Sequence, residues 1–436
     1  MPNVPALTTS QTPGPIVPQE LPDEFRDFAG KGKDAMPANS MHSSLVALKK
    51  LGLDCSYNVF RNEYLIGGAS FGEGTELSDN AELALRHIIA DNFGFEPSPV
   101  VMHDAVRRAC TMRSFHPVRD YLNSLPPWDG IERASRLLPD YFMTADTAFT
   151  RGVSRILVMA SVRRIFKPGT KFDYLSVLHS KEGLNKSSAI SALYGETFYT
   201  DQSTILLNAR DTEEALRGHW AQEIAELDGL GKADWGRLKA QLSRTNDRNR
   251  RVFERNPTSA PRSCVQWATT NDHTYLRALS GMNRRFFSLD VLKMIDVAKI
   301  VADRDDIWSE AVEMEASGES IMLPQALWAD AAVERQKRTA HDPWEDVLTD
   351  VSERGVEAAR AAIKRGDVVP YEIIGDEERV ASSFLLDTLC IQEKDRQPQH
   401  ASRAALVMRL FQWEGPTSVR IGGRNVKGYT RPMAWV

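Results

Sequence analysis

The sequence has few cysteines, and none are placed as a metal or redox site would require. The four cysteines of the 436-residue chain lie far apart, and no C-x-x-C pair occurs. A zinc ribbon or a redox-active dithiol is therefore excluded, because both need two cysteines on one short turn. We expect four reduced thiols, as is usual in the cytosol, at Cys55, Cys110, Cys264 and Cys390.

Long apolar runs and an excess of positive charge are also missing. No apolar run approaches the roughly 18 residues of a membrane span, and no basic region followed by an apolar block marks a secretory signal. We therefore expect a cytoplasmic protein without a membrane partner. The net charge of −5 argues against a uniformly basic nucleic-acid-binding protein, but it leaves room for a local basic site.

The length and the hydrophobic content of 42% indicate a globular protein of two or three domains with tails. Residues 1–22 contain six prolines, and we predict a disordered tail over 1–40. The patterns then predict a mostly helical region over 41–150 with a strand-like run at 55–68, an α/β core over 151–300, a helical extension over 301–380 and a small domain over 381–436. In the last of these, a helix-type segment precedes a hairpin-type segment at 418–431, an order compatible with a winged-helix-like module.

The segment 171–200 has the order of a phosphate-binding unit. A short apolar, β-rich run at 172–179 is followed by a loop of small residues at 180–187 and an amphipathic helix at 188–198. Strand, loop and helix in this order cradle phosphate groups. Two further strand-like runs, at 220–227 and 264–271, predict that the unit belongs to an α/β sheet.

The loop matches part of the G-x-x-x-x-G-K-S/T phosphate-loop motif. Lys186 and Ser187 are in place, whereas Ser180 and Asn185 replace the two glycines. Asparagine tolerates positive φ best among the other residues, so Asn185 is a plausible substitute. A Lys-Ser pair also occurs in ordinary loops, and the strand-loop-helix context is what favours function here. Lys186 would then contact the β- and γ-phosphates of ATP, Ser187 would coordinate Mg²⁺, and the nucleotide would be bound by Gly183, Leu184, Asn185, Lys186, Ser187 and Ser188.

An ATPase of this type needs carboxylates at the end of a neighbouring strand, to hold Mg²⁺ and to activate water. The run at 220–228 offers Glu223, Glu226 and Asp228. Glu226 is the first choice for the catalytic and metal-binding acid, Glu223 the second and Asp228 the third. The alternative is that these are solvated acids on a surface strand, as glutamates usually are.

Polar and basic residues near the third strand complete the candidate site. Asn271 at its end could hold the attacking water or sense the γ-phosphate, although an asparagine that simply starts a turn is common. Arg284 and Arg285 follow, and a guanidinium suits a transition state because it stays charged and binds two phosphate oxygens at once. We expect at least one of the two arginines to pair with a structural carboxylate.

Residues 232–255 contain eight basic and three acidic side chains, which is the pattern of a polyanion site rather than of a balanced surface loop. Trp235 and Phe253 could stack on bases. The predicted DNA-binding residues are Lys239, Arg244, Arg248, Arg250, Arg251 and Arg255.

Four stretches together resemble the virulence-associated protein E family, whose members are encoded by phages, prophages and pathogenicity islands. They are HPVRDYLNSLPPWDG at 116–130, KPGTKFDYLSVLHSKEGLNKSS at 167–188, EIAELDGLGKADWGRLKAQLSRTNDRNRRVF at 223–253 and TTNDHTYLRALSGMNRRFF at 269–287. Their order and spacing are similar to the family over roughly residues 40–300.

The resemblance implies a fold related to superfamily III helicases within the AAA+ group, and a homo-oligomeric ring. It implies that Lys186 and Ser187 are the Walker A residues, and that Arg284 or Arg285 reaches a neighbour's nucleotide. It also assigns Glu226, with Glu223, to the Walker B acids, and Asn271 to the sensor position. The segment between the acidic strand and the sensor strand, including Asp247, is where such helicases contact DNA.

The resulting expectation is an ATP- and Mg²⁺-dependent, helicase-like ATPase of phage or mobile-element replication in the bacterial cytoplasm. It would act on single-stranded or origin DNA, with a separate primase or replication initiator as a further partner. Two alternatives remain open: a DNA-binding scaffold whose ATPase site has decayed, and a regulatory NTPase without unwinding activity.

Overall fold

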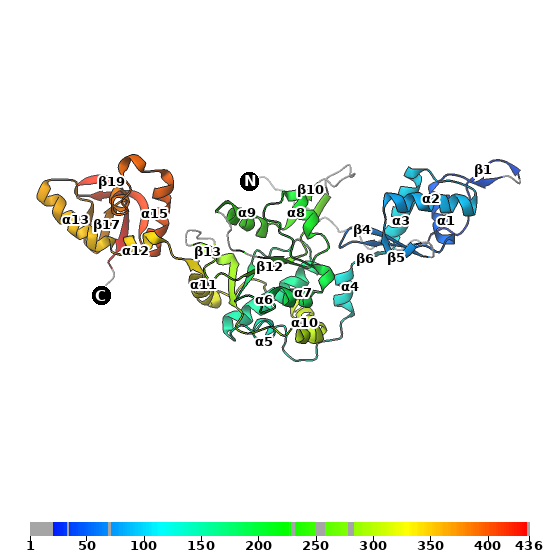
Figure 1. Cartoon of the computed structure of the whole chain (residues 1–436), viewed down its shortest axis with the longest axis horizontal. Helices are drawn as coiled ribbons and strands as arrows, with labels where there is room; N and C mark the ends of the chain where they lie inside the picture. The colour runs from blue at the N-terminus through cyan, green and yellow to red at the C-terminus, as the bar shows by residue number, and fades with distance from the viewer. Residues whose placement is uncertain are drawn as a thin grey trace, which may run out of the picture.

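The computed structural model describes residues 21–32, 35–68, 71–225, 227, 232–249, 258–277 and 283–433. Three parts follow one another along the chain, with the largest part between the other two (Figure 1). Of the tail predicted over 1–40, residues 1–20 and 33–34 lie outside the described residues. Within the described part of the chain, no helix combines the length and the apolar character that crossing a membrane requires.

The N-terminal part contains three helices and a small sheet. Each helix begins after a serine whose hydroxyl accepts a hydrogen bond from a backbone amide of the first turn; the helices are α1 (Met41–Lys50), α2 (Asp79–Phe93) and α3 (Pro99–Met112). The sheet order is β5 (Phe71–Glu76), β4 (Glu63–Gly68), β3 (Asp54–Asn58) and β6 (Ser114–Phe115). Strands β1 (Phe28–Ala29) and β2 (Met36–Pro37) form a separate antiparallel pair. The strand-like run predicted at 55–68 corresponds to β3 and β4, whereas β5 and β6 were not predicted in this mostly helical region.

The central part is built on a five-stranded sheet in which all neighbouring strands are parallel. The order is β14 (Phe286–Asp290), β7 (Leu175–His179), β12 (Val265–Thr270), β9 (Ala221–Ile224) and β8 (Tyr199–Thr200). Because the strands run in one direction, their carboxyl ends meet at one edge of the sheet and their amino ends at the other. The predicted α/β class is confirmed, whereas the sequence pattern did not predict β8 or β14.

Helices cover both faces of this sheet because the strand residues alternate between two cores. Leu178 and Trp267 share one core with α6 (Ala148–Phe166), α7 (Lys186–Tyr194) and α10 (Val297–Ala316). Val177 and Ile224 share the other with α9 (Lys232–Leu242). The remaining elements of this part are α4 (Pro117–Ser124), α5 (Leu137–Asp140), α8 (Ala209–Leu216), β10 (Asn246–Asn249), β11 (Thr258–Pro261) and β13 (Leu276–Arg277). After α10 come α11 (Trp328–Lys337) and β15 (Thr339–Ala340), which pairs with β13.

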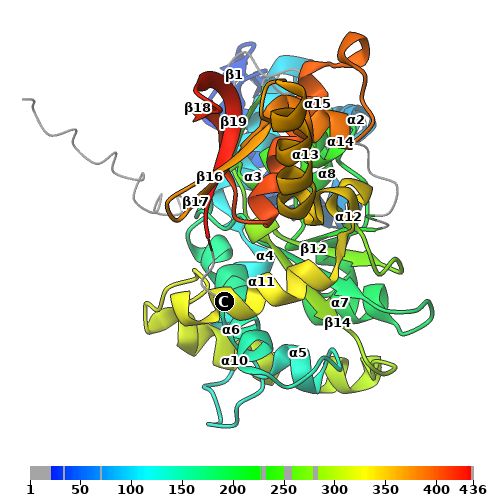
Figure 2. The ribbon, with the colours of Figure 1, turned by 90° about the vertical axis from the view of Figure 1, so that its left-hand side faces the viewer.

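The C-terminal part places helices on one side of an antiparallel sheet (Figure 2). The helices are α12 (Pro343–Thr349), α13 (Val351–Arg365), α14 (Ser382–Thr388) and α15 (Pro398–Leu410). The sheet order is β16 (Tyr371–Ile374), β17 (Glu377–Ala381), β19 (Arg424–Pro432) and β18 (Glu414–Ile421). One core joins Leu348 and Val351 with Trp413 and Tyr429. The packing thus groups α12 and α13 with the C-terminal residues rather than with the extension predicted over 301–380.

Candidate functional site

The loop of residues 180–185 connects β7 to α7 at the carboxyl edge of the central sheet. Asn185 has φ 63° and ψ 27°, and Gly183 has φ 84°. Both values lie in the region that glycine adopts most easily, so the prediction that Asn185 can take a glycine conformation is confirmed. The Asn185 side chain makes no capping hydrogen bond, which leaves the first backbone amides of α7 without a side-chain acceptor.

Lys186 is buried, and its ammonium group lies among oxygen atoms of the loop and of β12. Its Nζ donates to Ser180 Oγ at 2.9 Å, to the carbonyl oxygens of Ser180 and Lys181, and to Asn271 Oδ1 at 2.8 Å. These acceptors are uncharged, and a phosphate oxygen would form a stronger, charge-assisted hydrogen bond with the ammonium. Ser180, in a glycine position of the motif, thus provides an acceptor for Lys186.

Glu223 is fully buried at the third residue of β9. Its Oε1 accepts hydrogen bonds from Ser187 Oγ at 2.7 Å and from the Thr269 hydroxyl, and its Oε2 accepts one from the Tyr199 phenol. Burial and the contact with Glu223 raise the pKa of Tyr199, so the phenol stays protonated as a donor. Glu223 is therefore not a solvated surface acid, which was the alternative interpretation of this strand.

Strand order explains why these side chains meet. β12 lies between β7 and β9, so Thr269 stands between the phosphate loop on one side and Glu223 on the other. Asn271 comes directly after β12 and contacts Lys186. The three strands that the sequence predicted thus bring the candidate lysine, serine, glutamate and asparagine to one place.

A cavity of about 340 Å³ lies over this cluster. It is lined by Glu182, Gly183, Leu184, Asn185, Lys186, Ser187, Ser188, Ala225, Thr269, Thr270 and Asn271. A second hollow of about 510 Å³ shares Ser187 and Ser188 with it and continues along α7 towards Tyr199 and Arg304. Every predicted nucleotide-binding residue, from Gly183 to Ser188, therefore faces the same hollow.

The oxygen donors fit a hard divalent cation. Ser187 and Glu223 present a hydroxyl and a carboxylate 2.7 Å apart, and Mg²⁺ in phosphoryl-transfer sites takes one or two such ligands together with phosphates and water. Among the described residues, no group of three or more His, Cys, Asp or Glu side chains is arranged to hold a metal. Glu226, predicted as catalytic acid and metal ligand, and Asp228 lie outside the described residues.

The phosphate loop is hydrogen-bonded to the segment that follows β14. The Ile295 amide donates to the Leu184 carbonyl at 3.3 Å, and Asn185 Nδ2 donates to the Ile295 carbonyl at 3.2 Å. Ile295 itself is buried in the core, which fixes the position of these two hydrogen bonds. The positions of the phosphate loop and of the segment 291–296 are therefore coupled.

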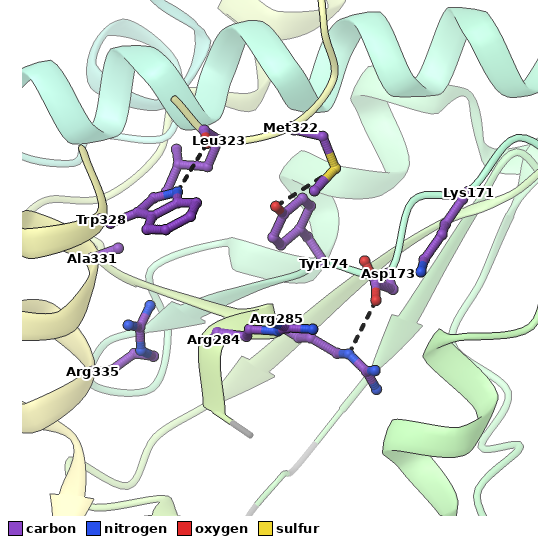
Figure 3. Close-up of a pocket in the computed structure, with 10 residues that line it drawn as sticks. All are labelled: Lys171, Asp173, Tyr174, Arg284, Arg285, Met322, Leu323, Trp328, Ala331 and Arg335. Carbon is purple, nitrogen blue, oxygen red and sulfur yellow. Dashed lines mark hydrogen bonds and ion pairs between the residues drawn. The ribbon is translucent and has the colours of Figure 1, made fainter. Parts of the chain in front are cut away.

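Arg284 and Arg285 lie at the opposite edge of the sheet, directly before β14. Arg285 pairs with Asp173 at 3.1 Å and donates to the Lys239 carbonyl at 2.9 Å, whereas Arg284 is exposed (Figure 3). One of the two arginines thus pairs with a structural carboxylate, as expected. Neither contacts the phosphate loop of its own chain.

The arginine-rich segment is described only in part. Lys239 is half-buried on α9, Arg244 is exposed at 3.6 Å from Asp247, and Arg248 lies in β10. Arg250, Arg251, Arg255 and Phe253 lie outside the described residues. The suggestion that Trp235 stacks on bases is wrong, because its ring is buried against Phe286 with centroids 5.3 Å apart.

Two residues of the cluster were not assigned from the sequence. Tyr199 belongs to β8, a strand of two residues that is too short to show a sequence pattern. Thr269 lies near the end of β12, two residues before Asn271, to which the sensor role was assigned. A hydroxyl at the end of a buried strand would have been the available signal for Thr269. Tyr199 carries no comparable signal, since its contact with Glu223 depends on the pairing of β8 with β9.

A search of the curated proteins found no match. Among solved structures, the apo structure of the NrS-1 C-terminal region (residues 305–718 of that protein) has a TM-score of 0.49 and 11% sequence identity, and covers 89% of this chain and 98% of that chain. The A-form apo structure of the same region has a TM-score of 0.46 and 12% identity, and covers 90% of this chain and 99% of that chain.

A family model gives the assignment. The model of the virulence-associated protein E-like domain matches residues 122–341, which include α6, the whole central sheet and the phosphate loop. The matched segment is slightly more than half of the chain, and it contains three of the four stretches that suggested the resemblance. The chain belongs to the virulence-associated protein E-like family.

Proposed function

We propose that this protein binds ATP with Mg²⁺ in the hollow over Lys186 and Ser187, and hydrolyses it as a helicase-like AAA+ ATPase in phage or mobile-element DNA replication. The observation that carries the proposal is the convergence of three strand ends. Lys186 contacts Asn271, and Ser187 contacts the buried Glu223. Lys186, Ser187 and Asn271 line one cavity at the carboxyl edge of the sheet. Ligands of open α/β sheets bind at this edge.

Each residue has a role that its position supports. The amides that begin α7 and the Lys186 ammonium would bind the phosphates, because a helix N-terminus and a buried ammonium both favour an anion there. Ser187 and Glu223 would hold Mg²⁺, which neutralises developing phosphate charge when bound. Asn271 would sense the γ-phosphate through Lys186, and Glu226 would activate the water.

Steady-state ATP hydrolysis, measured with and without single-stranded DNA, tests the proposal. Hydrolysis that DNA stimulates supports the motor. Binding without hydrolysis would instead favour the scaffold, and hydrolysis indifferent to DNA would favour a regulatory NTPase. The conformation of Asn185 weakens the main reason for expecting a decayed site, because the replaced glycine position keeps a glycine-like φ.

The DNA-binding assignment needs its own test. Replacing Arg248, Arg250 and Arg251 together with alanine should weaken DNA binding and make it less dependent on salt. With fewer contacts to phosphates, DNA binding releases fewer counterions. Basal ATP hydrolysis should persist while its stimulation by DNA disappears. Fluorescence anisotropy with a labelled oligonucleotide at several salt concentrations measures this. Unchanged affinity and salt dependence would remove the assignment.

A further inference from the structure

The C-terminal part of the molecule has a strongly uneven distribution of charge. Residues 398–433, which form α15 and the β18–β19 hairpin, carry six basic side chains and one acidic side chain. Residues 343–397 of the same part carry seven basic and thirteen acidic side chains. In a chain of net charge −5, such a local excess of positive charge is the electrostatic pattern of a polyanion-binding surface. The segment follows residues 122–341, so the family match does not account for it.

Structural ion pairs use only two of these six basic side chains. Arg403 pairs with Asp342 at 2.6 Å, and Arg431 pairs with Glu378 at 2.6 Å. The other four are exposed and have no ion pair within the part of the chain that the structure describes; they are Arg409, Arg420, Arg424 and Lys427. Their charges are therefore open to a ligand.

One face of α15 is exposed along the helix. Val407 and Met408 pack in the core of the C-terminal part, whereas Gln399, Ser402 and Arg409 are exposed. Helix positions three and seven residues apart lie on the same face, so these three side chains form one stripe. Amide, hydroxyl and guanidinium groups are the groups that hydrogen-bond to base edges in the major groove of DNA.

The outer end of the β18–β19 hairpin presents a group of polar and basic side chains across its two strands. Ser418 lies opposite Lys427, and Arg420 lies opposite Asn425. All four are exposed, whereas Val419 is buried between the two positions of β18. Because directly opposed side chains of an antiparallel pair lie about 5 Å apart, the two cations belong to one compact patch.

The helix and the hairpin form one surface. α15 leads into β18 and packs on it (Figure 2). Tyr429 shares the core with Met408, and since it lies two residues after Lys427 in β19, both side chains are on one face of the sheet. Burial raises the pKa of Tyr429 to about 12, and the nearby charge of Arg409 acts in the opposite direction. Arg409 therefore lies close to the base of the hairpin.

We propose that α15 and the β18–β19 hairpin bind double-stranded DNA, with α15 in the major groove and the hairpin on the phosphate backbone beside it. The major groove is about 12 Å wide and admits an α-helix. Cations without carboxylate partners on the same surface can neutralise phosphates instead. The surface shares no residue with the nucleotide hollow or with the arginine-rich segment 232–255, so this proposal does not rest on the proposed function.

A hairpin variant, Arg409→Ala with Arg420→Ala and Lys427→Ala, tests the cations. The dissociation constant for a labelled DNA duplex of mixed sequence should rise at least about 10-fold, and log K should depend on log salt with a slope shallower by about 2–3. The loss of affinity for a single strand of the same sequence should be smaller, because a single strand has no groove to receive the helix. Fluorescence anisotropy with the full-length chain at several salt concentrations measures both.

A matched control removes the same charge elsewhere in the C-terminal part. Arg360→Ala with Lys364→Ala and Arg365→Ala changes three exposed cations of α13. α13 packs on β16, which lies at the opposite edge of the sheet from β18. This control should bind the duplex like the wild type.

A second variant tests the helix separately. Gln399→Glu with Ser402→Glu places two negative charges on the exposed face of α15 near its amino end, where negative charge stabilises a helix. Duplex affinity should fall at least about 10-fold, because the added carboxylates meet the phosphates that flank the groove. Circular dichroism checks that each variant is folded.

The proposal is overturned if the hairpin variant binds the duplex like the α13 control, or if it loses as much affinity for the single strand as for the duplex. It is also overturned if the α15 variant binds the duplex like the wild type. Each of these results would assign the basic surface to another partner, such as an acidic protein.

ATP hydrolysis separates this proposal from the proposed function. Basal hydrolysis by the hairpin variant should equal that of the wild type, because the substituted residues do not line the nucleotide hollow. If duplex binding follows the expected pattern while the wild type does not hydrolyse ATP, the DNA surface stands and the proposed function fails. If the wild type hydrolyses ATP and the hairpin variant binds the duplex like the control, the DNA surface fails and the proposed function stands.

Discussion

The two edges of the central sheet differ in whether their charged side chains have partners within the same chain. At the carboxyl edge, Lys186 and Glu223 are surrounded by hydroxyl, amide and carbonyl groups of the same chain. At the amino edge, Lys171, Arg284 and Arg335 have no ion pair within the described residues. The first arrangement would suit a small charged ligand, whereas charges without partners beside exposed apolar side chains, here Trp328 and Met322, would suit a macromolecule.

Lys186→Ala is the strongest test of the candidate site at the carboxyl edge. Removing the ammonium deletes the proposed phosphate-binding cation, and ATP hydrolysis should fall at least about 100-fold, as for the loss of a group that stabilises transition-state charge. Lys181→Ala, an exposed lysine of the same loop, is the control and should stay within a few-fold of wild type. Turnover measured at saturating ATP decides, and unchanged turnover in Lys186→Ala would remove the phosphate-loop assignment.

Glu223→Gln and Glu226→Gln distinguish the two candidate catalytic acids. Glu223→Gln removes a buried charge that accepts three hydrogen bonds, so we expect the free energy of unfolding to fall by about 1–3 kcal/mol, together with hydrolysis. Glu226→Gln should preserve stability, permit ATP binding and trap the bound state. Urea denaturation and nucleotide-binding assays measure the two effects. Trapping by Glu223→Gln and not by Glu226→Gln would reverse the assignment.

Arg284→Ala and Arg285→Ala compare two neighbouring arginines at the amino edge, one exposed and one in an ion pair. Arg285→Ala leaves Asp173 without its partner and should reduce the free energy of unfolding by about 1–3 kcal/mol. Arg284→Ala should change the free energy of unfolding by less than about 0.5 kcal/mol, because Arg284 is exposed. A larger loss of stability in Arg284→Ala than in Arg285→Ala would contradict this division.

Asn185 gives the smallest expected effect. Asn185→Gly should leave stability within about 0.5 kcal/mol of wild type, since glycine adopts φ 63° freely. Asn185→Ala should cost about 1 kcal/mol and weaken ATP binding, because alanine resists a positive φ. Thermal unfolding and nucleotide titration compare the two variants. Equal behaviour of glycine and alanine at this position would show that backbone conformation does not limit the loop.

The sequence was most informative where structure is local. The β7 strand, the loop and α7 are consecutive, and the tolerance of Asn185 for positive φ is a property of one residue, so both could be predicted. Strand order could not, because the position of β12 between β7 and β9 depends on pairing between segments more than 40 residues apart. The pairing of Arg285 with Asp173 and the burial of Trp235 depend on the same long-range packing.

The two hydrogen bonds between the phosphate loop and Ile295 have a thermodynamic consequence. They connect the phosphate loop with the segment 291–296, whose last residue, Asp296, caps the amino end of α10. If a bound nucleotide changes the stability of this segment by some factor, then a change in the segment alters the affinity for the nucleotide by the same factor, because the coupling free energy is reciprocal. A substitution in the segment should therefore change nucleotide affinity without touching the nucleotide.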